Sequence, residues 1–392
     1  MNPLGGNDWF SWIMFMLLWV AFFFFYPKIM ISQILWQLEK SAMKLESYSR
    51  KSKKFIIKEI TKKPNKTLKE SINRFFEFFV IEPVSLDPYG IIKKLDHIIK
   101  EQRDRFKYFV NQIASGMDKE KQACIQMGLA GGITLHEIAK TVRHYVELIR
   151  KTKNLQIAMI LQMQLPLIER MAKALYKGTK SLTKGEPIGD GLGPYCAANL
   201  IGNAKTKEIE EEILMAKVNL KGRTAFILKA KGPGGRIGYP GKAVEKIIKK
   251  HKIARIITID AAAKLEGEKT GSIAEGVGVA MGGPGVERSY IENMAVKKNI
   301  PLDSIIVKMS QEEAIQPMRK VIKDAYPKVK EAIMRSLERT KKGDKVLIVG
   351  VGNTSGIGNN LKEVREMEKW VEKYEKKVKE EEKKKKKSIF GV

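Results

Sequence analysis

The chain has 392 residues, 43% of them hydrophobic and 30% charged, and its formal net charge is +29. This composition excludes an intrinsically disordered chain, and the length predicts two or three folded parts. The excess of Lys and Arg predicts attraction to anionic lipid, to nucleic acid or to an acidic protein. The two cysteines, Cys124 and Cys196, lie far apart and lack metal-ligand spacing, which favours a reduced, cytosolic setting for the bulk of the chain.

An uncharged apolar run extends from Trp9 to Pro27. Its length is close to the ~20 residues that cross a bilayer as a helix, and no cleavable signal peptide is expected because a basic start and a small-residue cleavage site are absent. The alternative is a buried core helix. Residues 28–79 carry 13 Lys and Arg against five acidic residues, and no Lys or Arg precedes the run. We therefore expect a single-pass protein of the cell membrane, with the bulk of the chain in the cytoplasm and the basic stretch facing anionic headgroups.

Helical spacing of apolar residues dominates the segments after this run. Residues 1–30 are expected to form the anchor, and residues 31–90 a basic amphipathic juxtamembrane region. Pro64 is expected to end a helix, and the two prolines of the stretch 82–90 predict a loop.

Residues 91–177 are predicted to form a helical domain, with methionine and aromatic side chains in its core. Within it, the glycines at 128–132 and the polar stretch 151–154 each predict a turn. Pro166 is expected to kink the last helix or to lie near its start.

The pattern changes between residues 178 and 360, where glycine clusters and β-branched runs alternate with helical segments. Strands are predicted at 222–230, 254–260, 303–309 and 344–353. This alternation predicts an α/β domain with a mainly parallel sheet and helices on both faces. Residues 361–392 are predicted to form a charged helix followed by a basic, solvated tail at 383–387.

Three polar residues in the glycine clusters are candidates for a site. Asp190 lies in "IGDGLGPY", Asp260 ends "ARIITID", and Asn353 follows "VLIVGVG". Because ligands bind at the carboxyl ends of parallel strands, we expect the three side chains to meet there. The candidate ligand-binding residues, mostly glycines that allow close backbone approach, are Gly191, Gly193, Gly282, Gly283, Gly285, Gly352 and Arg236.

These segments resemble a known protease family. "IGDGLGPYCAANL", "ARIITIDAAAKLEG", "GVGVAMGGPGVER" and "SIIVKMS" look like the ordered elements of spore germination proteases, and are similar also to hydrogenase maturation proteases. The resemblance covers roughly residues 186–310. It implies a phosphorylase/hydrolase-like α/β fold with Asp190 and Asp260 as the catalytic pair. The whole arrangement also resembles an uncharacterised archaeal membrane-anchored family, which implies no function.

The order of the segments departs from the protease pattern at one strand. In those families a strand ending in Gly-x-Gly-Asn precedes the first aspartate, whereas "KVLIVGVGN" lies near the end of this chain. We infer a circular permutation in which residues 345–351 take the place of that strand and bring Asn353 beside Asp190. The loop "GGPGVER" also lacks the Asn of the germination proteases.

Two carboxylates that share a proton can activate a water molecule and protonate a leaving group. The expected activity is therefore a metal-independent, peptidase-like hydrolysis without a cofactor, in which Asn353 orients the pair. Structural alternatives remain for both acids, because Asp190 could cap the helix that begins near Pro194 and Asp260 could bond the loop after its strand. The functional alternative is a basic docking module at the membrane surface that binds nucleic acid, a nucleotide or an acidic protein partner.

The remaining signals are weaker. "GVGNTSGIG" lacks the complete dinucleotide pattern and a Walker lysine, and "LHEIAK" fails the zinc-protease spacing. The four histidines are scattered, so no metal site is expected. The loop 231–242, which carries Arg236, could bind phosphate, cover the cleft or merely connect. Glu275 and Glu287 are further acids near the proposed cleft without an assigned role.

Overall fold

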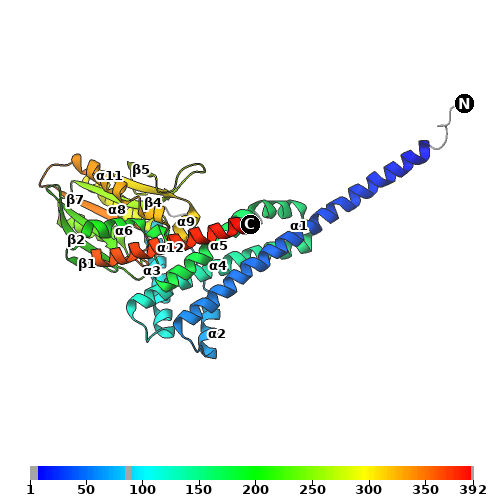
Figure 1. The fold of residues 1–392 in the computed structure, drawn as a ribbon, viewed down its shortest axis with the longest axis horizontal. Helices are drawn as coiled ribbons and strands as arrows, with labels where there is room; N and C mark the ends of the chain where they lie inside the picture. Colours follow the sequence, from blue (N-terminus) through cyan, green and yellow to red (C-terminus); the bar gives the residue numbers. More distant parts are fainter. Residues whose placement is uncertain (1–7, 84–89, 390–392) are drawn as a thin grey trace. The chain divides into compact units, whose positions relative to one another are not determined.

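The computed structural model describes residues 8–83 and 90–389, so most of the loop predicted at 82–90 lies outside the described residues (Figure 1). The chain divides into two compact units. The first comprises the residues up to Lys51 together with Thr134–Lys173. The second comprises Ser52–Ile133 together with the residues from Ala174 onward.

Parts of three long helices form the first unit: α1 (Asp8–Ile60), α4 (Lys119–Thr152) and α5 (Leu155–Lys184). Buried apolar side chains recur at helical spacing on each of them: Ile31, Ile34, Leu38, Ala42 and Leu45 on α1, Leu135, Ala139, Val142, Val146 and Ile149 on α4, and Ala158, Leu161 and Leu165 on α5. The predicted turn at 151–154 is confirmed between α4 and α5, and Pro166 lies inside α5.

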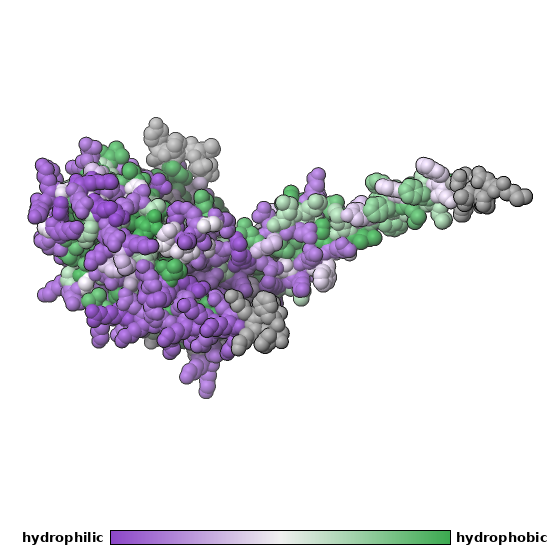
Figure 2. All heavy atoms as spheres, turned by 45° about the horizontal axis from the view of Figure 1, so that its top comes forward, coloured by the Kyte–Doolittle hydropathy of each residue, from purple (hydrophilic) through white to green (hydrophobic). Residues whose placement is uncertain are grey.

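The start of α1 is a candidate membrane span. In the described chain it is the one helix that is long and apolar enough to cross a bilayer. The side chains of its apolar window are not buried: Trp12 is 73% exposed and Phe24 is 70% exposed. Figure 2 shows hydrophobic residues along this arm. Because each Å² of apolar surface costs about 25 cal/mol in water, the arm favours an apolar surrounding.

The second unit begins with a helical cluster. Pro64 interrupts the helices as predicted, because α1 ends at Ile60 and α2 (Lys66–Phe75) starts after Asn65, whose side chain accepts a hydrogen bond from the Leu68 backbone. The end of α1, α2, α3 (Ile91–Ile113) and the start of α4 share one core. Its buried members are Ile56, Ile72, Phe76, Phe106, Val110, Ala114, Ile125, Leu129 and Ile133.

The turn predicted at 128–132 was wrong, since α4 runs through this segment without a break. Its glycines allow close helix packing instead. A Cβ atom at Gly131 would lie 2.5 Å from the Thr179 hydroxyl of α5, and one at Gly132 would lie 2.6 Å from the ring of Phe76. Glycine within a helix therefore reflects the approach of neighbours here, at a local cost of about 1 kcal/mol per residue.

The described residues form one seven-stranded sheet in the order β1-β2-β3-β7-β4-β6-β5. Its strands are β1 (Thr206–Glu210), β2 (Ile213–Leu220), β3 (Arg223–Ala230), β4 (Arg255–Ala263), β5 (Ile273–Val277), β6 (Leu302–Met309) and β7 (Lys345–Gly350). The central strands β3, β7, β4 and β6 are parallel, which confirms the α/β prediction, whereas β1, β2 and β5 pair antiparallel and were not predicted.

Helices cover both faces of the sheet (Figure 1). The helices of this region are α6 (Leu192–Ile201), α7 (Pro240–Lys250), α8 (Val286–Lys298), α9 (Gln311–Ile315), α10 (Lys320–Lys323), α11 (Tyr326–Glu338) and α12 (Leu361–Ile389). Helices α6, α10, α11 and α12 share a core with one face, and α7 and α8 share a core with the other. The basic run at 383–387 continues α12, whereas it was predicted to follow that helix as a tail.

Candidate active site

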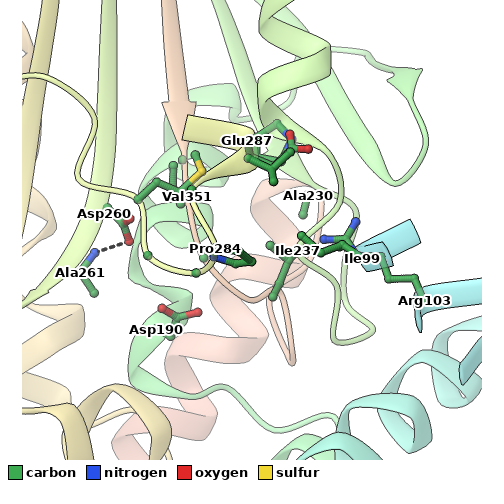
Figure 3. A pocket seen from close by; sticks show the side chains of 18 of the residues that line it. Ile99, Arg103, Asp190, Ala230, Ile237, Asp260, Ala261, Pro284, Glu287 and Val351 are labelled. Atoms are coloured by element: carbon green, nitrogen blue, oxygen red, sulfur yellow. Dashed lines mark hydrogen bonds between the residues drawn. The ribbon is translucent and has the colours of Figure 1, made fainter. Parts of the chain in front are cut away.

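A pocket of about 460 Å³ opens at the carboxyl ends of β3, β7 and β4, within the second unit (Figure 3). This is the edge at which the sequence placed the site. Asp190 and Asp260 line the pocket, and Figure 3 shows them on one side of it, with Arg103 on the other. Most other lining side chains are apolar: Ile99, Ala230, Ile237, Pro240, Met281, Pro284, Val286 and Val351.

Asp260 is placed by the alternation of β4. Ile257 and Ile259 point into the core beneath α6 and α11, whereas Ile256 packs with α7 and α8, so the even-numbered Asp260 faces the α7 and α8 side. The residue is only 4% exposed, and one carboxylate oxygen accepts a 2.6 Å hydrogen bond from the Ala261 backbone. The buried part of β4 therefore ends at an acid that lines the cavity, although the strand itself continues to Ala263, three residues beyond the predicted end.

Asp190 arrives from a short 3₁₀ turn, Gly189–Gly191, immediately before α6. Its carboxylate accepts a 2.8 Å hydrogen bond from the backbone N–H of Asn353, in the segment that follows β7. The turn has no side-chain cap bond, so Asp190 does not act as the helix cap that was its structural alternative. Its partner instead lies 163 positions away in the chain.

The two acids influence each other electrostatically. Burial raises the pKa of Asp260 well above its usual value, and the negative charge of Asp190 raises it further. Burial also raises the pKa of Asp190, against the opposing hydrogen bond from Asn353. Each carboxylate has one backbone donor to hold its charge, so ionising both in a low-dielectric pocket is unfavourable. The arrangement therefore disfavours the state in which both carboxylates are ionised.

Four of the predicted ligand-binding glycines line the pocket: Gly282, Gly283, Gly285 and Gly352. The first three precede α8, and Gly285 is its N-cap residue. Nothing lies within 4 Å of a Cβ atom built on these three, so their backbone faces open space. The first N–H groups of a helix have no intrahelical acceptor, and they can hold an oxyanion at this position.

Gly191 and Gly193 were predicted to bind a ligand, but they do not line the pocket. A Cβ atom at Gly193 would lie 2.5 Å from the Ile259 oxygen and closer still to the Val351 oxygen. A Cβ atom at Gly191 would collide with the side chain of Ile357. Gly193 allows the start of α6 to lie directly on β4 and the end of β7, and Gly191 allows the preceding turn to lie against the segment after β7. These contacts set the position of Asp190.

The side chain of Asn353 does not orient the acids as predicted. It is buried, its oxygen accepts from the Ser355 backbone at 2.9 Å, and its nitrogen lies 3.4 Å from the sulfur of Met127. Only its backbone N–H reaches Asp190. The asparagine therefore shapes the turn after β7, and the turn presents the donor.

Arg236 also lies outside the pocket. Its guanidinium is buried against Glu120 of α4 at 2.5 Å and donates to the Lys119 carbonyl at 3.2 Å. The hydroxyl of Thr354 further holds the loop, because it accepts from the Arg236 backbone and donates to the Gly234 carbonyl. The glycine loop 231–239 is thus a fixed wall, of which Ile237 lines the pocket.

Helix α3 closes the far side of the pocket and was not predicted to take part. Arg103 donates to the Gly238 carbonyl at 2.9 Å and stacks on the Tyr239 ring, and Asp96 pairs with Lys242 at 2.9 Å. Glu287, left without a role, also lines the pocket and accepts from the Gly241 backbone at 2.6 Å. Glu275 lies on β5 and pairs with Arg335 outside the pocket. The sequence of α3 contains no motif that indicates a role in the pocket, because its apolar spacing is that of an ordinary amphipathic helix.

A buried lysine lies below the loop 231–239. Lys229 of β3 is 1% exposed, and its amine donates to the Ala230 carbonyl and to the Asn359 side chain, both at 2.8 Å. Burial lowers the pKa of Lys229 to about 7. The amine can therefore lose its proton near neutral pH, and its hydrogen bonds tie the end of β3 to the segment after β7.

We expect the stability of the wild-type chain, relative to Lys229→Met, to rise between about pH 7 and pH 10. In this window the unfolded chain keeps a proton that the folded chain lacks, and each pH unit is worth about 1.4 kcal/mol. Urea unfolding of both chains in micelles at several pH values measures the difference. A difference that does not change with pH would show that Lys229 stays charged in the fold.

Among the residues that the structure describes, no group of three or more His, Cys, Asp or Glu side chains is arranged to hold a metal ion. No curated protein and no solved structure matches the chain. Two family models match it, however: the N-terminal domain of a protein of unknown function (DUF1512) over residues 12–185, and the C-terminal domain of the same family over residues 188–358. The acid pair, the glycine loop before α8 and β7 all lie in the C-terminal domain. The chain therefore belongs to the DUF1512 family and carries both of its domains.

Proposed function

We propose that this protein is a membrane-anchored hydrolase that cleaves peptide-like amide bonds on the cytoplasmic side, using Asp190 and Asp260. One observation carries the proposal. Two buried acids from distant parts of the chain line one pocket, and the charge of the first raises the pKa of the second. Acids of this kind cluster at catalytic sites because their chemistry needs a shared proton.

The chemistry follows from the one-proton state of the pair. The ionised carboxyl group takes a proton from a water molecule, whose oxygen forms a bond to the substrate carbonyl carbon. The protonated carboxyl group donates a hydrogen bond to the carbonyl oxygen, and the N–H groups at the start of α8 stabilise the negative charge that develops there. Collapse of the tetrahedral intermediate breaks the C–N bond, and a proton passes from the pair to the leaving amine.

The place of β7 supports the resemblance to the germination and hydrogenase maturation proteases. A circular permutation requires this late strand to lie inside the sheet next to the strand that carries the second acid. β7 lies between β3 and β4, with Ile348 paired to Ile257 of β4. The turn after β7 then brings the Asn353 backbone to Asp190.

The anchor follows from the exposed apolar start of α1. The basic residues that follow Pro27 favour the cytoplasm for everything after the span, because positively charged segments are retained on that side. The substrate would then be a cytoplasmic peptide or the cytoplasmic part of a membrane protein.

The test compares cleavage of a mixture of peptides by the full chain in micelles, read by mass spectrometry. We expect the wild-type chain to produce cleaved peptides in the presence of a chelator and the double variant Asp190→Asn, Asp260→Asn to produce none. Glu275→Gln is the matched control, because Glu275 pairs with Arg335 outside the pocket. Equal cleavage by the double variant would overturn the proposal, as would a wild-type chain that only binds a polyanion or an acidic protein.

A further inference from the structure

We infer that the first unit makes a second contact with the membrane, in which the α4–α5 turn and the first turns of α5 lie in the headgroup layer of an anionic bilayer. The inference rests on the membrane anchoring proposed above, and it goes beyond that anchor. It concerns the turn of residues Lys151–Asn154 and the exposed apolar side chains just after it, Met159, Ile160 and Met163.

The charge pattern of α1 fixes where the hydrocarbon layer would end. The helix is continuous from Asp8 to Ile60, and no charged residue lies between Asp8 and Lys28. At 1.5 Å per residue this interval is about 29 Å long, close to the ~30 Å of a hydrocarbon core. Lys28 therefore marks the inner edge of that core, and its long side chain reaches the headgroups.

Side-chain contacts give the height of the other two helices along α1. His136 of α4 lies 3.1 Å from Ser49, and Arg143 bonds both Glu39 and Glu46, at 2.6 and 2.7 Å. Farther along α4, Arg150 bonds Glu39 at 2.6 Å, so α4 runs back toward Lys28. On α5, Gln162 donates to Gln37 at 2.7 Å, and Glu169 accepts from Ser41 at 2.5 Å.

Counting back along both helices places the turn at the edge of the hydrocarbon core. Seven residues before Gln162, the start of α5 at Leu155 comes level with about residue 30 of α1. The end of α4 at Thr152 comes level with about residue 33. The burial of Ile31 agrees with this placement of the two helix ends, because Ile31 is only 8% exposed although it lies just three residues after Lys28. The turn thus lies within about 10 Å of Lys28 along the helix axis.

The surface at this height has the composition of a membrane contact. Arg150, Lys151 and Lys153 are exposed around the turn. Met159, Ile160 and Met163 follow on an outer face of α5 and are 45%, 62% and 77% exposed. Cations at headgroup height next to exposed apolar side chains are typical of helices that bind at a bilayer surface. Binding to a partner protein would not explain why these residues lie at the height at which the uncharged span ends.

The contact can be measured with nitroxide labels on single introduced cysteines in the full chain, reconstituted in vesicles. The two native cysteines are buried, and the unmutated chain controls for their labelling. Val20→Cys reports the span, Ile160→Cys reports the turn region, and Tyr145→Cys is the control on α4, about 10 Å farther out than the end of that helix. Vesicles contain phosphatidylcholine with or without phosphatidylglycerol, and the readout is accessibility to oxygen against a water-soluble nickel chelate.

We expect the Val20 label to be in lipid, the Ile160 label to be protected from the chelate in phosphatidylglycerol vesicles, and the Tyr145 label to be in water. Lys151→Gln with Lys153→Gln should lower the ratio of docked to undocked turn by about thirtyfold in these vesicles, because each cation near the surface contributes about fivefold. An Ile160 label in water beside a Val20 label in lipid overturns the inference and leaves the anchor intact. A Val20 label in water instead overturns the anchor. A third outcome would be an Ile160 label that is protected from the chelate in both kinds of vesicle and shows spin–spin contact between chains. That result would assign this face to a second copy of the chain and would also overturn the inference.

Discussion

Replacing Asp260 with asparagine is expected to lower the rate of peptide hydrolysis by about a thousandfold or more, because general acid–base catalysis by such a group contributes 10² to 10⁴. Asparagine keeps the shape of the side chain, and its oxygen can still accept from the Ala261 backbone. The loss would then report chemistry and not a collapse of the pocket. Initial rates of the wild-type chain, Asp260→Asn and the control Glu275→Gln on one cleaved peptide measure the effect.

The same substitution is expected to raise thermal stability at neutral pH. Burial and the charge of Asp190 raise the pKa of Asp260 above its usual 3.8, so the folded chain binds a proton more tightly than the unfolded chain does. The resulting stability is fully present below about pH 4 and is lost as the pH rises through the raised pKa. The gain in Tm of Asp260→Asn should therefore be large at pH 8 and vanish near pH 3.5. A gain that is equal at both pH values would contradict the shared-proton pair.

Catalysis should show the same coupling in its pH profile. The active form holds one proton on the pair, and this form is lost when the pH rises through the higher pKa. Because both pKa values are raised, the wild-type rate should persist to a higher pH than that of two independent, exposed aspartates. The descending limb of kcat/KM against pH reports this higher value.

The sequence pattern predicted the sheet edge well because strand and loop signals there agree. Asp190 and Asp260 lie 70 positions apart, yet each follows from a local pattern at the ligand-binding edge: Asp260 ends the buried part of a strand, and Asp190 lies between two glycines just before a helix. The late strand 345–350 was placed by its similarity to the missing strand of the protease pattern, and it lies at the centre of the sheet.

Glycine was the least informative residue, because three different physical demands select it. At 128–132 it permits helices to touch, at Gly193 it permits a helix to touch strand ends, and at 282–285 it lies in open space beside the pocket. Only the last fits a ligand-binding role, and the local sequence does not distinguish the three cases.

Local sequence patterns also could not predict contacts that depend on another part of the chain. Arg236 was expected at the ligand, but a buried guanidinium needs a carboxylate, and Glu120 of α4 supplies it. Arg103 and Asp96 line the pocket only because α3 lies across it. Their roles depend on tertiary contacts that no spacing along the chain expresses.

The change Gly193→Ala is expected to destabilise the second unit by about 3 kcal/mol or more, which lies at the upper end of the range for overpacking. The added methyl group would meet two backbone oxygens, of Val351 and Ile259, which cannot turn away as a side chain would. Gly350 and Gly352 lie at the same contact, and a Cβ atom at Gly350 would in turn meet the Gly193 oxygen. The start of α6 would have to lift from β4 and β7. Urea unfolding of the full chain in micelles measures the change in the free energy of unfolding.

Gly276→Ala is the matched control. Gly276 lies on the edge strand β5, nothing lies within 4 Å of a Cβ atom there, and its backbone does not require glycine. Alanine should then leave stability unchanged or raise it by a few tenths of a kcal/mol, because the unfolded chain loses freedom. If Gly193→Ala were equally harmless, α6 would not be seated on the strand ends. The position of Asp190 would then need another support, because the hydrogen bond from Asn353 alone cannot hold a turn against a displaced helix.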